Sequence, residues 1–101
     1  MERLQNFING EYCDPVNGQY IDNYEPATGN VYAQIPNSSS EDVELAVSAA
    51  EKAFPIWSGM SIEERSAIMV RLSEGIQSRM DEFVAAESRD NGKPKSLAAH
   101  V

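Results

Sequence analysis

The chain has 101 residues, of which 42% are apolar and 24% charged, and its 16 acidic against 8 basic residues give a formal net charge of −8. This composition is that of a globular chain of at most one domain, and the acidic balance argues against nucleic-acid or anionic-membrane partners, which need clustered Lys and Arg. The one cysteine, Cys13, cannot form an internal disulfide, and the amino terminus lacks the apolar core of a secretory signal. No apolar run nears the roughly 20 residues that span a bilayer. We therefore expect a cytoplasmic protein.

Residues 7–35 are predicted to form short strands joined by turns. The dipeptide Asn9-Gly10 separates Phe7-Ile8 from Glu11-Tyr12-Cys13. It favours the type I′ turn of a two-residue hairpin because both positions need a positive φ. The rest of this region alternates turns with extended segments: a turn at 14–18, a strand at 19–24, a turn at 26–29, and a strand at 31–35 that Pro36 ends.

Residues 39–91 are predicted to form amphipathic helices. Ser39 suits the N-cap of the first helix, with Asp42 three residues later as its acidic partner, and Ser61 with Glu64 forms a capping box for the second. A third helical stretch covers about residues 80–89, and the sequence leaves open whether it continues the second helix. Asn91-Gly92, followed by Pro94, is a typical helix stop.

The predicted helices carry apolar stripes at helical spacing. The first stripe contains Val43, Ala46, Val47, Ala50 and Phe54, and the second contains Ile62, Met69, Leu72 and Ile76. Pro55 is predicted to break the first helix, which places Trp57 in the connection. We expect the aromatic side chains of Phe54, Trp57 and Phe83 to belong to a core rather than to a ligand cage.

Three segments in this order carry a resemblance to a known family: Phe7-Ile8-Asn9-Gly10-Glu11, Glu25-Pro26-Ala27-Thr28-Gly29 and Glu87-Ser88-Arg89-Asp90-Asn91-Gly92-Lys93-Pro94. Together they resemble the amino-terminal region of the aldehyde dehydrogenase superfamily, except that Glu25 replaces the family's usual Asn. The resemblance implies an α/β fold in which residues 1–101 are the first part of the cofactor-binding domain. Their hairpin and helices would flank a Rossmann-like sheet built by later residues.

The same resemblance implies an NAD(P)-dependent oxidation of an aldehyde to a carboxylate. In that chemistry a cysteine forms a thiohemiacetal, hydride passes to NAD or NADP, and a glutamate activates water. The family's catalytic and cofactor-binding residues lie downstream, so none is assigned here and the segment alone is expected to be inactive. The segments at 22–29 and 54–58 look most like those of muconic-type semialdehyde dehydrogenases. Betaine-aldehyde-like members of the family are a close alternative. The implied partners are a small aldehyde and further copies of the enzyme, as a homodimer or homotetramer.

Two positions match a structural monovalent-cation site found in many family members. They are Asn23, which contributes its backbone carbonyl, and Asp90, which contributes its carboxylate; oxygen ligands suit a hard cation. The alternative is that Asp90 only hydrogen-bonds the turn at Asn91-Gly92. Cys13 is predicted to be an inert, partly buried thiol, because Asp14 disfavours a neighbouring thiolate and the only histidine, His100, is remote in sequence.

A second hypothesis is a non-catalytic helical module that binds a protein partner through its apolar stripe. The end of the chain distinguishes the two hypotheses. Residues 96–101 have the pattern of a helix that has only begun, without a cap or a polar finish. We therefore expect the sequence to belong to a longer protein.

Overall fold

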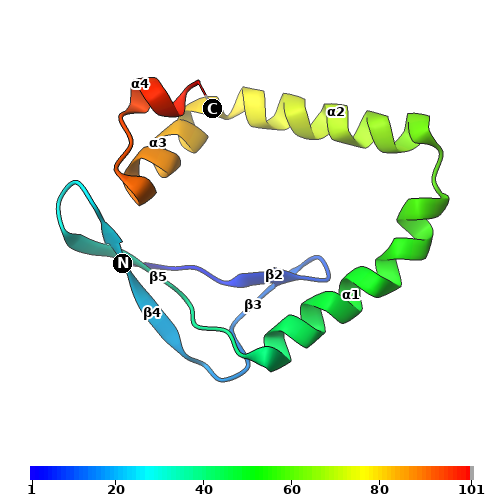
Figure 1. Cartoon of the computed structure of the whole chain (residues 1–101), viewed down its shortest axis with the longest axis horizontal. Coiled ribbons are helices and arrows are strands. Elements are labelled where there is room, and N and C mark those ends of the chain that lie inside the picture. The colour runs from blue at the N-terminus through cyan, green and yellow to red at the C-terminus, as the bar shows by residue number, and fades with distance from the viewer. Residues whose placement is uncertain (101) are drawn as a thin grey trace. The chain divides into compact units, whose positions relative to one another are not determined.

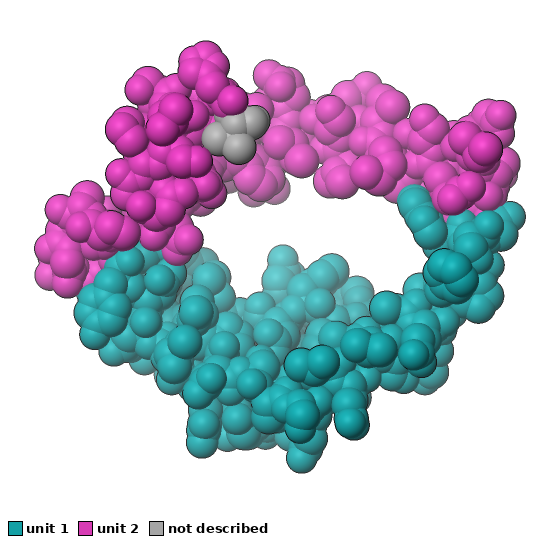
Figure 2. Space-filling model, in the orientation of Figure 1, with its two compact units in different colours: residues 1–24, 31–59 teal, residues 25–30, 60–101 magenta. Residues whose placement is uncertain are grey.

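The computed structural model describes residues 1–100. Within them lie the strands β1 (Glu2–Arg3), β2 (Asn6–Ile8), β3 (Glu11–Cys13), β4 (Tyr20–Glu25) and β5 (Asn30–Pro36), and the helices α1 (Ser40–Gly59), α2 (Ile62–Ser78), α3 (Met80–Asn91) and α4 (Lys95–Ala98) (Figure 1). The chain divides into two compact units, Met1–Tyr24 with Val31–Gly59, and Glu25–Asn30 with Met60–Val101 (Figure 2). None of the helices in the described part of the chain has the length and apolarity needed to cross a membrane.

The predicted hairpin of the first unit is confirmed. Strands β2 and β3 pair antiparallel, with Ile8 opposite Glu11 and Phe7 opposite Tyr12. The turn residues have the positive φ angles that a type I′ turn requires, 55° at Asn9 and 79° at Gly10. The rings of Phe7 and Tyr12 lie 5.0 Å apart across the hairpin and add a cross-strand contact.

A three-stranded sheet in the order β1-β5-β4 completes the strands of this unit. Strands β4 and β5 match the extended segments predicted from the sequence. Strand β1, which the sequence analysis does not predict, pairs in parallel with β5, with Glu2 opposite Ala33 and Arg3 opposite Gln34. The guanidinium of Arg3 donates to Oε1 of Gln34 and lies 4.3 Å from the ring centroid of Tyr20. Two residues are too few to show a strand periodicity, so β1 is recognised by its backbone pairing with β5 rather than by a sequence pattern.

The start of α1 is fixed by a buried carboxylate. Asp42 is only 4% exposed, and its two oxygens accept hydrogen bonds from the backbone N–H groups of Ser39 and Val16, each at 2.9 Å. The hydrogen bond from the Ser39 backbone and then that from Val16 lower the pKa of Asp42 below its ordinary value. The bond from the Ser39 backbone to Asp42 confirms the acidic half of the predicted capping arrangement, and the contact with Val16 also ties the turn at 14–18 to the helix.

Because the folded-state pKa of Asp42 is lowered, its stabilising effect is complete above the unfolded-state value of about 4 and is lost as the pH falls through the lowered pKa. We expect Asp42→Asn to reduce helicity at neutral pH. We also expect the variant to lose less helicity on acidification than the parent chain does. Far-ultraviolet circular dichroism during an acid titration measures both effects. Glu41→Gln, which alters an exposed carboxylate in the same first turn, should leave most of the acid transition unchanged.

The prediction that Pro55 breaks the first helix is wrong, because α1 continues through Pro55 to Gly59 and contains Trp57. Proline lacks an N–H, so the carbonyl of Glu51 loses its usual helical donor. Both Glu51 and Pro55 are exposed. Water can therefore solvate that carbonyl, and the cost of the missing hydrogen bond is low enough for the helix to persist.

The hairpin lies beside α1 in Figure 1 and faces only part of the predicted stripe, since Val43, Ala46 and Ala50 line hollows together with hairpin residues. The helix residues that line the hollows facing Ile8 and Asn9 include the small side chains of Ala46, Ala49 and Ala53. The three large members of the stripe nevertheless remain mostly exposed: Val43, which also lines a hollow with Phe7 and Ile8, by 58%, Val47 by 51% and Phe54 by 65%. We call these three residues the outer stripe of α1.

In the second unit, one of the two hydrogen bonds of the capping box predicted for α2 is confirmed: Oγ of Ser61 accepts from the N–H of Glu64 at 3.1 Å. The structure also answers the question left open by the sequence. Helices α2 and α3 are separate, because Arg79 between them adopts φ −120° and ψ 26°. The helix expected over 96–101 appears as the short α4, while Val101 lies outside the described residues.

Neither unit encloses a large apolar core within the described residues. The buried apolar side chains there include the small residues Ala33 and Ala98, and no large side chain is fully enclosed. Trp57 and Phe83 remain 38% and 49% exposed. The expectation that they and Phe54 belong to a core is therefore wrong for this chain taken by itself, because the sequence pattern shows that a face is apolar but not what covers it.

Candidate functional site

Two of the three family-like segments meet in the second unit. Nε of Arg89 on α3 lies 3.5 Å from Oε2 of Glu25, the last residue of β4 before the turn to β5. At the end of α3, Gly92 has φ 80°, and a Cβ atom built there would lie 3.1 Å from Cβ of Pro26. The absence of a side chain at position 92 therefore permits both the left-handed helix stop and the close approach of the turn.

The polypeptide after α3 is held by local hydrogen bonds. The N–H of Gly92 donates to the carbonyl of Ser88 at 2.9 Å, and Oγ of Ser88 donates to the carbonyl of Lys93 at 2.6 Å. The N–H of Lys93 donates to Oδ1 of Asn91 at 2.8 Å, and its ammonium lies 3.6 Å from Oε1 of Glu87. These contacts account for the polar composition of the segment and confirm the helix stop predicted from it.

The predicted cation ligands lie in different units. Asn23 belongs to β4 in the first unit, is half-buried, and donates through Nδ2 to the hydroxyl of Tyr32 at 3.1 Å. Asp90 is an exposed residue of α3 in the second unit, and it has further interactions of its own. Among residues 1–100 there is no cluster of three or more His, Cys, Asp or Glu that could hold a metal ion. Since the proposed ligands include a backbone carbonyl, the pairing of Asn23 with Asp90 stays a prediction.

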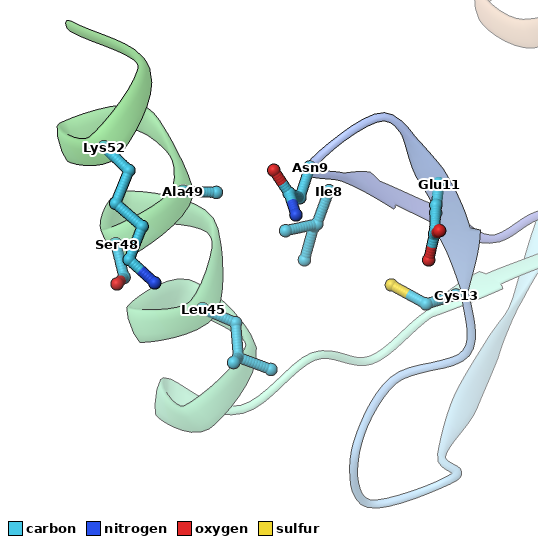
Figure 3. Close-up of a pocket in the computed structure, with 8 residues that line it drawn as sticks. All are labelled: Ile8, Asn9, Glu11, Cys13, Leu45, Ser48, Ala49 and Lys52. Atoms are coloured by element: carbon cyan, nitrogen blue, oxygen red, sulfur yellow. The ribbon is translucent and has the colours of Figure 1, made fainter. Parts of the chain in front are cut away.

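A hollow of about 250 Å³ in the first unit lies next to the reactive side chain of Cys13 (Figure 3). It lies between the β2–β3 hairpin and α1 and is lined by Ile8, Asn9, Glu11, Cys13, Leu45, Ser48, Ala49 and Lys52. The half-buried thiol of Cys13 points into it. Sequence reasoning did not predict this hollow, because it arises from the packing of a hairpin on a helix.

The chemistry of the hollow does not support catalysis by Cys13. None of its lining residues is a histidine that could take a proton from the thiol. Its carboxylate, Glu11, offsets the charge of its one ammonium, Lys52, and the lining includes no glycine-rich helix start that could bind the phosphates of a dinucleotide. The residues around Cys13 therefore do not fit NAD or NADP.

Comparison with known proteins gives one consistent result. The sequence profile of the aldehyde dehydrogenase family matches residues 12–100. The 2-aminomuconic semialdehyde dehydrogenase of Mus musculus is 47% identical over 95 residues, which cover 94% of this chain and 19% of that protein. The 2-hydroxymuconic semialdehyde dehydrogenase of Pseudomonas sp. (strain CF600) is 40% identical over 102 residues, covering 100% of this chain and 21% of that protein.

The likeness extends to three dimensions. The crystal structure of an NAD-dependent aldehyde dehydrogenase from Sinorhizobium meliloti matches with a TM-score of 0.92 and 36% identity, covering 98% of this chain and 20% of that one. The α/β class predicted from the sequence is thereby confirmed. The chain spans about a fifth of the length of the curated relatives it matches.

Proposed function

The chain belongs to the aldehyde dehydrogenase family, and from this membership we propose that it is the amino-terminal part of an NAD(P)-dependent enzyme that oxidises a semialdehyde to a carboxylate. The similarity to two muconic semialdehyde dehydrogenases, each at 40% identity or more, supports this substrate class. The complete enzyme would act in the cytoplasm as a homodimer or homotetramer. Residues outside this chain would supply the catalytic cysteine, the thiohemiacetal chemistry and the cofactor site.

The role proposed for these 101 residues is structural. The observation that carries it is the exposure of the outer stripe of α1, together with that of Ile62, Met69 and Leu72 on α2, each more than half exposed. Burial of such a side chain stabilises a protein by roughly 1.5–3 kcal/mol. Because this stripe is exposed to water, its burial under another surface is strongly favourable. The remainder of an aldehyde dehydrogenase would provide that surface.

The alternative, a free-standing module that binds another protein, also needs an exposed apolar face. A fusion protein separates the two hypotheses. The chain would replace the 21% of the Pseudomonas 2-hydroxymuconic semialdehyde dehydrogenase that it matches. We expect the fusion to reduce NAD with 2-hydroxymuconic semialdehyde and the chain alone to show no turnover.

The control for this experiment is the intact Pseudomonas enzyme assayed in parallel. A fusion that folds as a soluble oligomer yet has no activity would contradict the proposed function. Cysteine-dependent NAD reduction by the 101-residue chain alone would contradict the structural role.

A further inference from the structure

The chain contains three Asn-Gly dipeptides, Asn9-Gly10, Asn17-Gly18 and Asn91-Gly92. At such a pair the backbone nitrogen of the glycine can attack the side-chain amide of the asparagine, and glycine has no Cβ to hinder the approach. The attack requires the amide to leave any hydrogen bonds that hold it, and it requires the glycine nitrogen to be released from its own. The three pairs differ in both respects.

The pair Asn91-Gly92 is held at both reacting groups. Nδ2 of Asn91 donates to Oε1 of Glu87 at 2.6 Å, and Oδ1 of Asn91 accepts from the N–H of Lys93 at 2.8 Å. The N–H of Gly92 donates to the carbonyl of Ser88 at 2.9 Å. A reaction at Asn91 would first have to break these hydrogen bonds.

The pair Asn17-Gly18 is held in the same way. Nδ2 of Asn17 donates to the carbonyl of Asn37 at 3.2 Å, and Oδ1 of Asn17 accepts from the N–H of Gln19 at 2.9 Å. The N–H of Gly18 donates to the carbonyl of Pro15 at 2.8 Å. The amide and the attacking nitrogen are therefore both engaged here as well.

The pair Asn9-Gly10 lacks such contacts. Both residues are exposed at the tip of the β2–β3 hairpin, where Figure 3 shows the Asn9 side chain beside the hollow. Among residues 1–100, neither the amide of Asn9 nor the N–H of Gly10 has a hydrogen-bond partner in the protein. Neither group has to give up a bond within the protein before it reacts.

We propose that Asn9 is a site of spontaneous deamidation, in which water is the only other reactant. The Gly10 nitrogen loses its proton to a base in solution and bonds to Cγ of Asn9, the Cγ–Nδ2 bond breaks, and ammonia leaves with a proton. Water then opens the succinimide ring at one of its two carbonyls. Cleavage of the new nitrogen–Cγ bond yields aspartate, and cleavage of the original peptide bond yields isoaspartate. This modification goes beyond the proposed function and does not depend on it.

Either product changes the hairpin at its tip. Isoaspartate adds a backbone carbon to a two-residue turn whose geometry sets the register of β2 with β3. Aspartate adds a negative charge at the hollow that Glu11 already lines. Deamidation thus places an altered residue at the point where the hairpin faces α1.

The test is peptide mapping by mass spectrometry of the fusion protein after incubation in mildly alkaline buffer. Asn9 should convert at least about tenfold faster than Asn17 and Asn91, because each of those pairs must break two or three hydrogen bonds. The isolated chain should give the same ranking, since most of these bonds join residues two to four positions apart. In concentrated urea, which disrupts the bonds, the three rates should converge.

Matched variants test whether the hydrogen bonds set the ranking. Glu87→Ala removes the acceptor for Nδ2 of Asn91 and should speed conversion of Asn91 about fivefold, as for the loss of one hydrogen bond. Glu87→Gln keeps an acceptor oxygen and should convert at the parent rate. An unchanged rate at Asn91 in Glu87→Ala would contradict the anchoring argument.

The outcomes separate this inference from the proposed function. Conversion of Asn17 or Asn91 as fast as that of Asn9 in native buffer overturns the deamidation proposal. An Asn9 that stays intact in native buffer while it converts in urea overturns it as well. An inactive fusion contradicts the proposed function alone, because peptide mapping requires no catalysis.

Discussion

Val47→Asp should abolish NAD reduction by the fusion protein while leaving the helicity of the isolated chain nearly unchanged. In the isolated chain the side chain of Val47 is 51% exposed, so water can solvate a carboxylate at that position. In the fusion the outer stripe is expected to be covered, and an unpaired charge buried there costs several kcal/mol. Such a cost is a large part of the total stability of a domain, which is about 5–15 kcal/mol.

The matched control for Val47→Asp is Ser48→Asp. It introduces the same charge one residue later, about 100° around α1, where Ser48 is exposed at the hollow that Lys52 also lines. NAD reduction and soluble yield of both fusions are the measurements. Full activity of the Val47→Asp fusion would show that the outer stripe stays in water in the complete enzyme, contrary to the proposed role.

Gly92→Ala should destabilise the fusion protein by about 2 kcal/mol or more. An L-residue in the left-handed conformation costs about 1–2 kcal/mol, and Gly92 has φ 80°. The added Cβ would also meet Pro26 at 3.1 Å, a contact that requires the 25–30 turn to move. Denaturant midpoints followed by loss of NAD reduction measure the effect.

A second glycine supplies the control for this substitution. Gly75 lies inside α2, and a Cβ atom at this position would have no neighbour within 4 Å. Gly75→Ala should therefore stabilise the protein by about 0.5–1 kcal/mol, the usual difference in helix propensity. Equal effects of the two substitutions would mean that neither the positive φ nor the contact with Pro26 matters at position 92.

The features of the fold that depend on a few adjacent residues could be predicted from the sequence. Asn9-Gly10 specifies the hairpin because a positive φ is required at both positions, and Ser61 starts α2 because its hydroxyl satisfies a free N–H. Features that depend on distant contacts could not. The bond from Val16 to Asp42 and the pairing of β1 with β5 join residues 26 to 31 positions apart.

The wrong predictions have a common physical origin. A helical pattern shows that Val43, Val47 and Phe54 share an apolar face, but the pattern does not name the surface that covers it. In this chain the hairpin packs against the alanines of α1 and leaves the three large side chains mostly exposed. Similarly, Pro55 has a strong intrinsic preference against a helix interior, yet exposure to water allows α1 to continue.

The site could be predicted only in part. The segments around Glu25 and Gly92 were singled out by their sequence, and the structure brings them together through Arg89 and Pro26. The pairing of Asn23 with Asp90 depends on the placement of two separate units and remains a prediction. The hollow at Cys13 has no counterpart in any short motif, since residues from a hairpin and a helix line it.

Calorimetry of the isolated 101-residue chain tests most directly whether its apolar helix faces need a covering surface. We expect helices detectable by circular dichroism, strong binding of a hydrophobic dye, and a broad thermogram without a cooperative peak. A sharp two-state transition of a monomer, with an unfolding enthalpy near the roughly 70 kcal/mol typical of a 100-residue domain, would contradict the account.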